Sequence, residues 1–145
     1  MQKGLVSIFI GVAMLFCACG NKPNSVVMND VKISDWSNTT TLTYNNTEIG
    51  EFDMGIMLHV NRGFSAEELS LQVTTLTPDS LRYTEQIILP IKQMPQSSIQ
   101  AATDIEIPYR RNVHFRRKGE YIWHITPTQK VVGVEAVGMH IHVNN

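Results

Sequence analysis

Histidines are the residues whose type and spacing first suggest a chemical site. His140 and His142 stand two positions apart in the stretch GMHIHV. On a β-strand both side chains would therefore point to the same side of the sheet. Imidazole binds zinc well, and a catalytic zinc centre has three protein ligands and one open position. His124 and His59 stand in other alternating stretches and would complete such a site only if the strands were neighbours.

The same histidines also have a simpler interpretation. Each occupies a polar position in an alternating stretch, where solvated strand residues normally stand. No carboxylate occurs at ligand spacing beside His140 and His142. We therefore expect no metal and no other cofactor, and the His140–His142 pair remains the weaker alternative.

Sequence motifs for other kinds of catalysis are absent. The chain has no G-x-S-x-G segment for a nucleophilic serine and no glycine-rich phosphate-binding loop. Glu67 and Glu68 stand in a turn-like segment, whereas Glu120 and Glu135 stand alone. The sequence therefore predicts a protein that is not an enzyme.

The densest run of charge is the stretch YRRNVHFRRKGEY. Its basic residues are Arg110, Arg111, Arg116, Arg117 and Lys118. The favoured interpretation is a solvated edge strand or loop, where basic side chains discourage edge-to-edge pairing. The alternative is contact with an anionic surface, such as lipid headgroups, cell-wall polymer or an acidic protein. The formal net charge of the chain is −1, so composition does not suggest nucleic-acid binding.

Both cysteines, Cys17 and Cys19, lie near the N-terminus. They end an apolar run that starts at Gly4 after a short basic beginning, which is the layout of a secretory signal. The run is shorter than the about 20 residues of a membrane-spanning helix. Ala18 directly before Cys19, with Phe16 three positions before it, resembles the lipobox of bacterial lipoproteins. There the leader is cut before a cysteine that carries lipid.

This N-terminus gives the expected organisation of the chain. Residues 1–18 would be a lipoprotein signal peptide, and acylated Cys19 would anchor the mature chain to a membrane. Residues 19–32 are polar and are expected to be a flexible tether, followed by one domain over residues 33–145. No Asp follows the cysteine, which by analogy with lipoprotein sorting signals favours the periplasmic face of the outer membrane. An uncleaved anchor and a soluble secreted protein are the alternatives.

Beyond the tether, apolar residues alternate with a period of two, which is typical of strands with one buried face. The clearest stretches are MGIMLHV from Met54, LSLQVT from Leu69, YIWHIT from Tyr121 and VGMHIHV from Val137. TTTLTY and LRYTEQIILPI are further expected strands, and turn-like segments separate all of them. The pattern predicts an all-β, antiparallel β-sandwich of jelly-roll or immunoglobulin-like type. SAEEL and TPTQKVVGVEAV are each expected to hold one helical turn.

The C-terminal third carries a family resemblance. Its motif residues are Ile107, Pro108 and Tyr109, then Gly119, Tyr121 and Ile125, then Val131, Gly133, Val134, Val137, Gly138 and Ile141. Together with the early Trp36, Phe64 in a turn between paired strands, and the lipobox, this pattern resembles the gliding-motility-associated lipoproteins of the GldH type.

The resemblance implies a non-enzymatic lipoprotein of the bacterial cell envelope. Such a protein would be an accessory or structural component of a motility- or secretion-associated complex. Its partners would be the membrane, through acylated Cys19, and envelope proteins. From the residues alone an alternative remains, a periplasmic or surface β-sandwich that binds a glycan or small ligand. That module would display aromatic side chains to solvent, whereas Tyr121 and Trp123 share the side expected to be buried.

Overall fold

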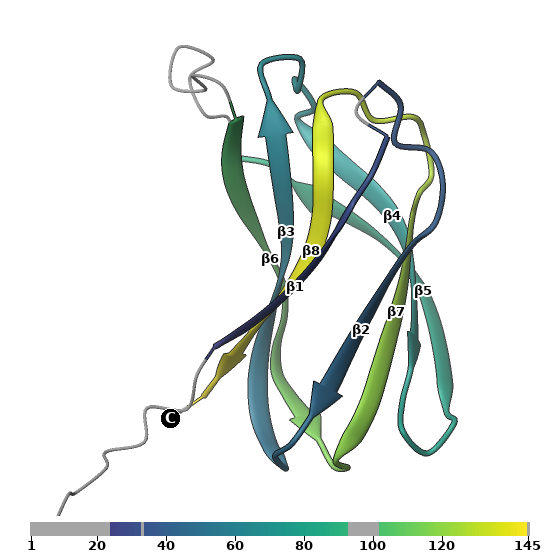
Figure 1. Ribbon diagram of the computed structural model, residues 1–145, viewed down its shortest axis with the longest axis vertical. Coiled ribbons are helices and arrows are strands. Elements are labelled where there is room, and N and C mark those ends of the chain that lie inside the picture. Colours follow the sequence, from purple (N-terminus) through teal and green to yellow (C-terminus); the bar gives the residue numbers. More distant parts are fainter. Residues whose placement is uncertain (1–23, 33, 93–101, 145) are drawn as a thin grey trace, which may run out of the picture.

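Two four-stranded antiparallel sheets pack face to face in the computed structural model, which describes residues 24–32, 34–92 and 102–144 (Figure 1). The first sheet has the order β1-β8-β3-β6, with β1 (Ser25–Asp30), β8 (Val134–Val143), β3 (Gly50–Asn61) and β6 (Ala102–Phe115). The second has the order β2-β7-β4-β5, with β2 (Thr40–Asn46), β7 (Gly119–Pro127), β4 (Glu68–Leu76) and β5 (Arg82–Pro90). The prediction of an all-β antiparallel sandwich is confirmed.

The strand pairing decides between the two sandwich types left open by the sequence. β1 pairs with β8, β2 with β7, β3 with β6 and β4 with β5. The chain is thus a long hairpin, closed at β4 and β5, that is rolled up so that its other successive strands lie in opposite sheets. Eight strands in two sheets with this winding form a jelly roll.

Alternation along each strand decides which side is buried. On β3, Met54, Ile56, Leu58 and Val60 are at most 5% exposed. Three further strands show the same regularity, with buried sides formed by Leu69, Leu71 and Val73, by Tyr121, Trp123 and Ile125, and by Val137, Met139 and Ile141. The expected buried side is therefore confirmed for the four clearest stretches of the sequence.

The core is aromatic at the end where β6 turns into β7. The ring of Phe115, the last residue of β6, lies with its centroid 4.4 Å from that of Tyr121 and 4.8 Å from that of Phe52. Trp123 continues this layer along β7, at 6.4 Å from Tyr121. Large rings packed at these separations stabilise both sheets and fix the end of β6 on the core.

Two expectations about local structure are wrong. The tether expected over residues 19–32 contains β1, which pairs with β8 from Ser25 opposite Ile141 to Asp30 opposite Ala136. The segments SAEEL and TPTQKVVGVEAV form no helical turn, and the second leads into β8 at Val134. In the described part of the chain no helix is long and apolar enough to cross a membrane.

Candidate functional site

The basic run of the sequence is divided between β6 and the turn that follows it. β6 is an edge strand, in agreement with the favoured interpretation of this run. Arg110 and Arg111 belong to β6, whereas Arg116, Arg117 and Lys118 form the turn from β6 to β7. The structure therefore distributes the five basic side chains over two places.

Irregular pairing directs Arg110 toward β5. Along the β3–β6 ladder Met54 pairs with Arg110 and Gly55 with Pro108, so Tyr109 is an extra residue on β6. A bulge of this kind changes which side of the strand the following residues face. As a result both Tyr109 and Arg110 reach Glu85 on β5.

Glu85 links the two sheets on the side where β5 and β6 are edge strands. The hydroxyl of Tyr109 donates a hydrogen bond to Oε1 of Glu85 at 2.5 Å, and Arg110 forms an ion pair with Oε2. Burial raises the pKa of Tyr109, and the hydrogen bond to the carboxylate raises it further. The pKa of Arg110 is also raised, because Glu85 outweighs the opposing effect of burial. Both donors keep their protons at neutral pH.

A cleft of about 830 Å³ opens on this side of the sandwich. Its rim includes Tyr83 and Arg110, and its floor includes Phe115, Tyr121 and Trp123. Tyr121 and Trp123 are buried, as expected from the sequence, yet they also line this cleft. Alternation could not predict the cleft, because it depends on how far apart two edge strands lie in space.

The turn after β6 is fixed to the neighbouring turn between β4 and β5. Nε of Arg117 lies 3.1 Å from Oδ2 of Asp79, and the hydroxyl of Thr77 donates to Oδ1 of Asp79 at 2.5 Å. The hydrogen bond from Thr77 is the main reason why the pKa of Asp79 is lowered. Arg116 and Lys118 are exposed beside this link.

The same turn lies at the end of the sandwich where β1 begins. Neighbouring strands of the first sheet are antiparallel, so β1 begins toward the end of the sheet where β3 starts and β6 ends, with Ser25 level with Met54 through Ile141 (Figure 1). Cys19, the expected lipidation site, lies outside the described residues, six positions before Ser25. Six extended residues span at most about 20 Å.

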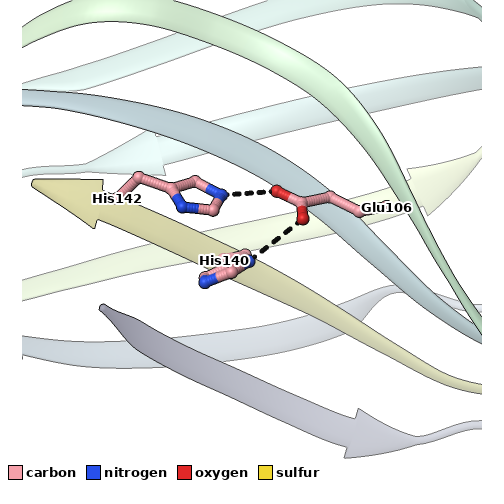
Figure 2. A group of neighbouring side chains, drawn as sticks. All are labelled: Glu106, His140 and His142. Atoms are coloured by element: carbon pink, nitrogen blue, oxygen red, sulfur yellow. Dashed lines mark hydrogen bonds and ion pairs between the residues drawn. The ribbon is translucent and has the colours of Figure 1, made fainter. Parts of the chain in front are cut away.

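The histidine pair gains a carboxylate that lies far away in the sequence. His140 and His142 lie on the outer face of the first sheet, because Met139 and Ile141 between and beside them face the core. The side chain of Glu106 on β6 reaches both (Figure 2). Nε2 of His142 lies 2.6 Å from Oε1 of Glu106, and Nδ1 of His140 lies 3.2 Å from Oε2.

Gly55 allows this contact across the sheet. β3 lies between β6 and β8, and Gly55 stands opposite His140 on one side and Pro108 on the other. A Cβ atom at Gly55 would lie 2.8 Å from Cγ of Glu106 and closer still to its Oε1. The missing side chain is therefore the reason why the Glu106 carboxylate can lie over the central strand.

The electrostatics of this group favour an ionised carboxylate. Burial alone would raise the pKa of Glu106, but the interactions of its carboxylate with His142 and His140 outweigh it, and the pKa is lowered. The two imidazole rings lie with their centroids 3.6 Å apart. Nδ1 of His140 is shielded from solvent and makes no well-aligned hydrogen bond.

The other two histidines do not join the pair. Nδ1 of His59 lies 2.6 Å from Oδ1 of Asp104 on the same outer face. His124 belongs to the second sheet, where its Nδ1 lies 2.9 Å from the hydroxyl of Thr41. Neither lies with the pair as the third ligand considered from the sequence, and Glu106 is the third residue that the structure groups with His140 and His142.

The fold and these two sites define a jelly-roll protein with a lateral cleft and a His–Glu–His cluster on one outer face. Comparisons of the sequence with models of known protein families and with curated proteins found no match.

Proposed function

We propose that this protein is a lipid-anchored component of the bacterial cell envelope, comparable in role to the gliding-motility lipoproteins that it resembles. Acylated Cys19 attaches it to a membrane, with the periplasmic face of the outer membrane favoured. It acts by binding other envelope proteins of a motility- or secretion-associated complex, and it catalyses no reaction. Nucleic acid is not among its partners.

The observation that carries this proposal is that the basic turn and the start of β1 share one end of the sandwich. A lipid on Cys19 would hold the start of β1 within about 20 Å of the bilayer and leave the basic turn free to face it. Arg116 and Lys118 would then contact anionic headgroups, which contributes about 1 kcal/mol for each basic residue at the surface. Ile49, 57% exposed in the neighbouring turn between β2 and β3, would add apolar contact.

The cleft between β5 and β6 supports the binding part of the proposal. Its walls combine aromatic rings with Arg110. Aromatic side chains and arginine are the residue types that carry most of the energy in protein interfaces. The exposed ring of Tyr83, 58% accessible at the rim, is in a position to be covered by a partner.

The experiment is crosslinking in the native host, followed by purification and mass spectrometry of the captured proteins. Wild type is compared with Cys19→Ala, which removes the anchor, and with Tyr83→Ala, which removes the exposed ring at the cleft. Ile88→Ala is the matched control, because Ile88 is 66% exposed on the same strand but does not line the cleft.

We expect motility- or secretion-associated envelope proteins with wild type and Ile88→Ala, and few or none with Cys19→Ala and Tyr83→Ala. Recovery of this chain alone, or with glycans only, would contradict the role in a complex. It would then favour the second candidate, a ligand-binding module.

The second candidate function is binding of a glycan or small ligand, and the size and aromatic floor of the cleft favour it. Both tryptophans are 1% exposed, but Trp123 lines the cleft, whereas Trp36 does not line it and donates its indole N–H to Thr40. Titration with cell-wall glycan fragments would therefore change only the fluorescence of Trp123. A change that is lost in Trp123→Phe would support this candidate, and an unchanged spectrum would argue against it.

A further inference from the structure

We infer that Glu106, His140 and His142 form a binding site for a divalent transition metal, with zinc as the best-fitting ion. One ligand atom from each residue lies within 4.8 Å of the other two. Two imidazoles and one carboxylate are a known zinc ligand set, with the fourth position left to water or another ligand. The site lies on the outer face of the first sheet, apart from the cleft and the basic turn.

One of the two nitrogen–oxygen distances already suits a tetrahedral ion, and the other is shorter. Zinc binds nitrogen and oxygen at close to 2.0–2.2 Å, so two ligand atoms of one zinc lie about 3.3 Å apart. Nδ1 of His140 and Oε2 of Glu106 are already 3.2 Å apart. Nε2 of His142 lies 2.6 Å from the other carboxylate oxygen, Oε1, and this pair must open by about 0.7 Å when an ion binds.

The state of His140 supports an ion at this position. Its Nδ1 is shielded from solvent and makes no well-aligned hydrogen bond, although Oε2 of Glu106 lies 3.2 Å away, and the side chain is only 17% exposed. Shielded polar atoms without a partner are rare in folded proteins and call for an explanation. A metal ion bound to this nitrogen would satisfy it and would take the place of the hydrogen bond between Glu106 and His142.

The site is built on the regular part of the sheet. His140 and His142 are held two residues apart on β8, the strand paired with both β1 and β3. Ligands on paired strands keep their separation better than ligands on loops, which lowers the entropy lost on binding. Glu106 depends on Gly55, so Gly55 acts as a positioning residue for the third ligand.

Gly55 also provides a specific test. Among the described glycines, Gly119 and Gly133 have positive φ angles and Gly55 does not. The backbone of Gly55 can therefore accept alanine. The added Cβ would displace the flexible side chain of Glu106. Gly50→Ala is the matched control in the same strand, because its Cβ would meet only the ring of Phe52, at 3.7 Å.

The experiment titrates zinc into the purified full chain by calorimetry, with thermal unfolding recorded beside it. The chain is kept in detergent, carries a tag without histidine and is treated with EDTA before dialysis. Cys17→Ser and Cys19→Ser are present throughout, because free thiols bind zinc. We expect one zinc ion per chain and a higher unfolding temperature with zinc.

In this background Gly55→Ala, which acts through Glu106, should weaken zinc binding by roughly 10–100-fold, and His142→Ala, which removes a ligand, at least as much. Gly50→Ala and His59→Ala should bind as tightly as the parent. Circular dichroism checks that each variant is folded. If His142→Ala does not fold, Glu106→Gln, which keeps the size of a partly exposed side chain, gives the same test.

Two results would overturn the proposal. One is the absence of binding with zinc, nickel and copper alike. The other is zinc binding that is unchanged in Gly55→Ala and in the ligand variants, because the ion would then lie elsewhere, for example at His59.

Discussion

The cleft and the outer face of the first sheet each contain a carboxylate that contacts two other side chains. In the cleft, Glu85 accepts from Tyr109 and Arg110. On the outer face, Glu106 contacts His140 and His142. A phenol and a guanidinium keep their protons at neutral pH, so Glu85 forms a fixed link between the sheets.

The partners of Glu106 differ in a way that matters for function. A neutral imidazole has a lone pair that can bind a metal, whereas a guanidinium has none. In the cleft, one carboxylate and its two partners hold the two sheets together. On the outer face the same arrangement, in our proposal, binds an ion. The difference between the two regions lies in the type of partner, and it can be tested by changing one residue at a time.

The largest effect is expected from Trp123→Ala in the floor of the cleft. Trp123 is 1% exposed, and deletion of a buried aromatic side chain costs about 3–5 kcal/mol of unfolding free energy. Urea unfolding measures this loss. Zinc affinity should stay at the parental value if the variant is folded, because Trp123 belongs to the second sheet and the three proposed zinc ligands belong to the first. A parallel loss of zinc affinity would show that the two regions are not independent.

Glu85→Ala is expected to come next. It leaves the hydroxyl of Tyr109 without its acceptor in a partly buried place, which costs about 1–3 kcal/mol. Glu85→Gln keeps an acceptor and should lose less. Equal losses in the two variants, measured by urea unfolding, would mean that the ion pair with Arg110 matters more than the hydrogen bond.

Tyr109→Phe is expected to change how stability depends on pH in the alkaline range, beyond the loss of its hydrogen bond to Glu85. Because the pKa of Tyr109 is raised above its usual 10.0, the folded chain keeps this proton where the unfolded chain loses it. Stability should therefore fall as pH rises above 10, by up to about 1.4 kcal/mol per pH unit. Tyr109→Phe should reduce that slope in urea unfolding at pH 8–11.5. Tyr83→Phe leaves the hydrogen bond between Tyr109 and Glu85 in place, so this control should show the parental slope. A slope that stays the same in Tyr109→Phe would contradict the prediction.

The smallest effect is expected from Glu106→Gln in metal-free protein. The side chain of Glu106 is 36% exposed, and ion pairs at such positions contribute about 0–1 kcal/mol. In saturating zinc the same variant should lack the rise in unfolding temperature seen in the parent. A large loss without metal would make Glu106 a structural link like Glu85 and would remove the contrast between the two regions.

The sequence predicted the parts of the fold that local alternation determines. The buried sides of β3, β4, β7 and β8 are read directly from period-two patterns, since each strand must turn one face to the core. β1 was missed because its stretch SVVMND alternates weakly, and its strand conformation comes from pairing with β8. The jelly-roll order depends on which strands pair, which no single stretch encodes.

The candidate sites show the same limit at the level of single residues. His140 and His142 were found because one strand holds both. Glu106 was missed because its contact requires β6, β3 and β8 to be neighbours and Gly55 to lie between. The basic run looked like one group in sequence, but a bulge turns Arg110 into the cleft.

The central claim, a sandwich held to a membrane by a lipid on Cys19, is tested most directly by the mass of the native N-terminus. Membrane and soluble fractions of the host would be compared for wild type and Cys19→Ser, and the N-terminal peptide analysed by mass spectrometry. We expect a membrane-bound chain that begins at Cys19 with its lipid, and a Cys19→Ser chain that keeps residues 1–18. A wild-type chain that is soluble, or that carries no lipid on Cys19, would contradict the claim.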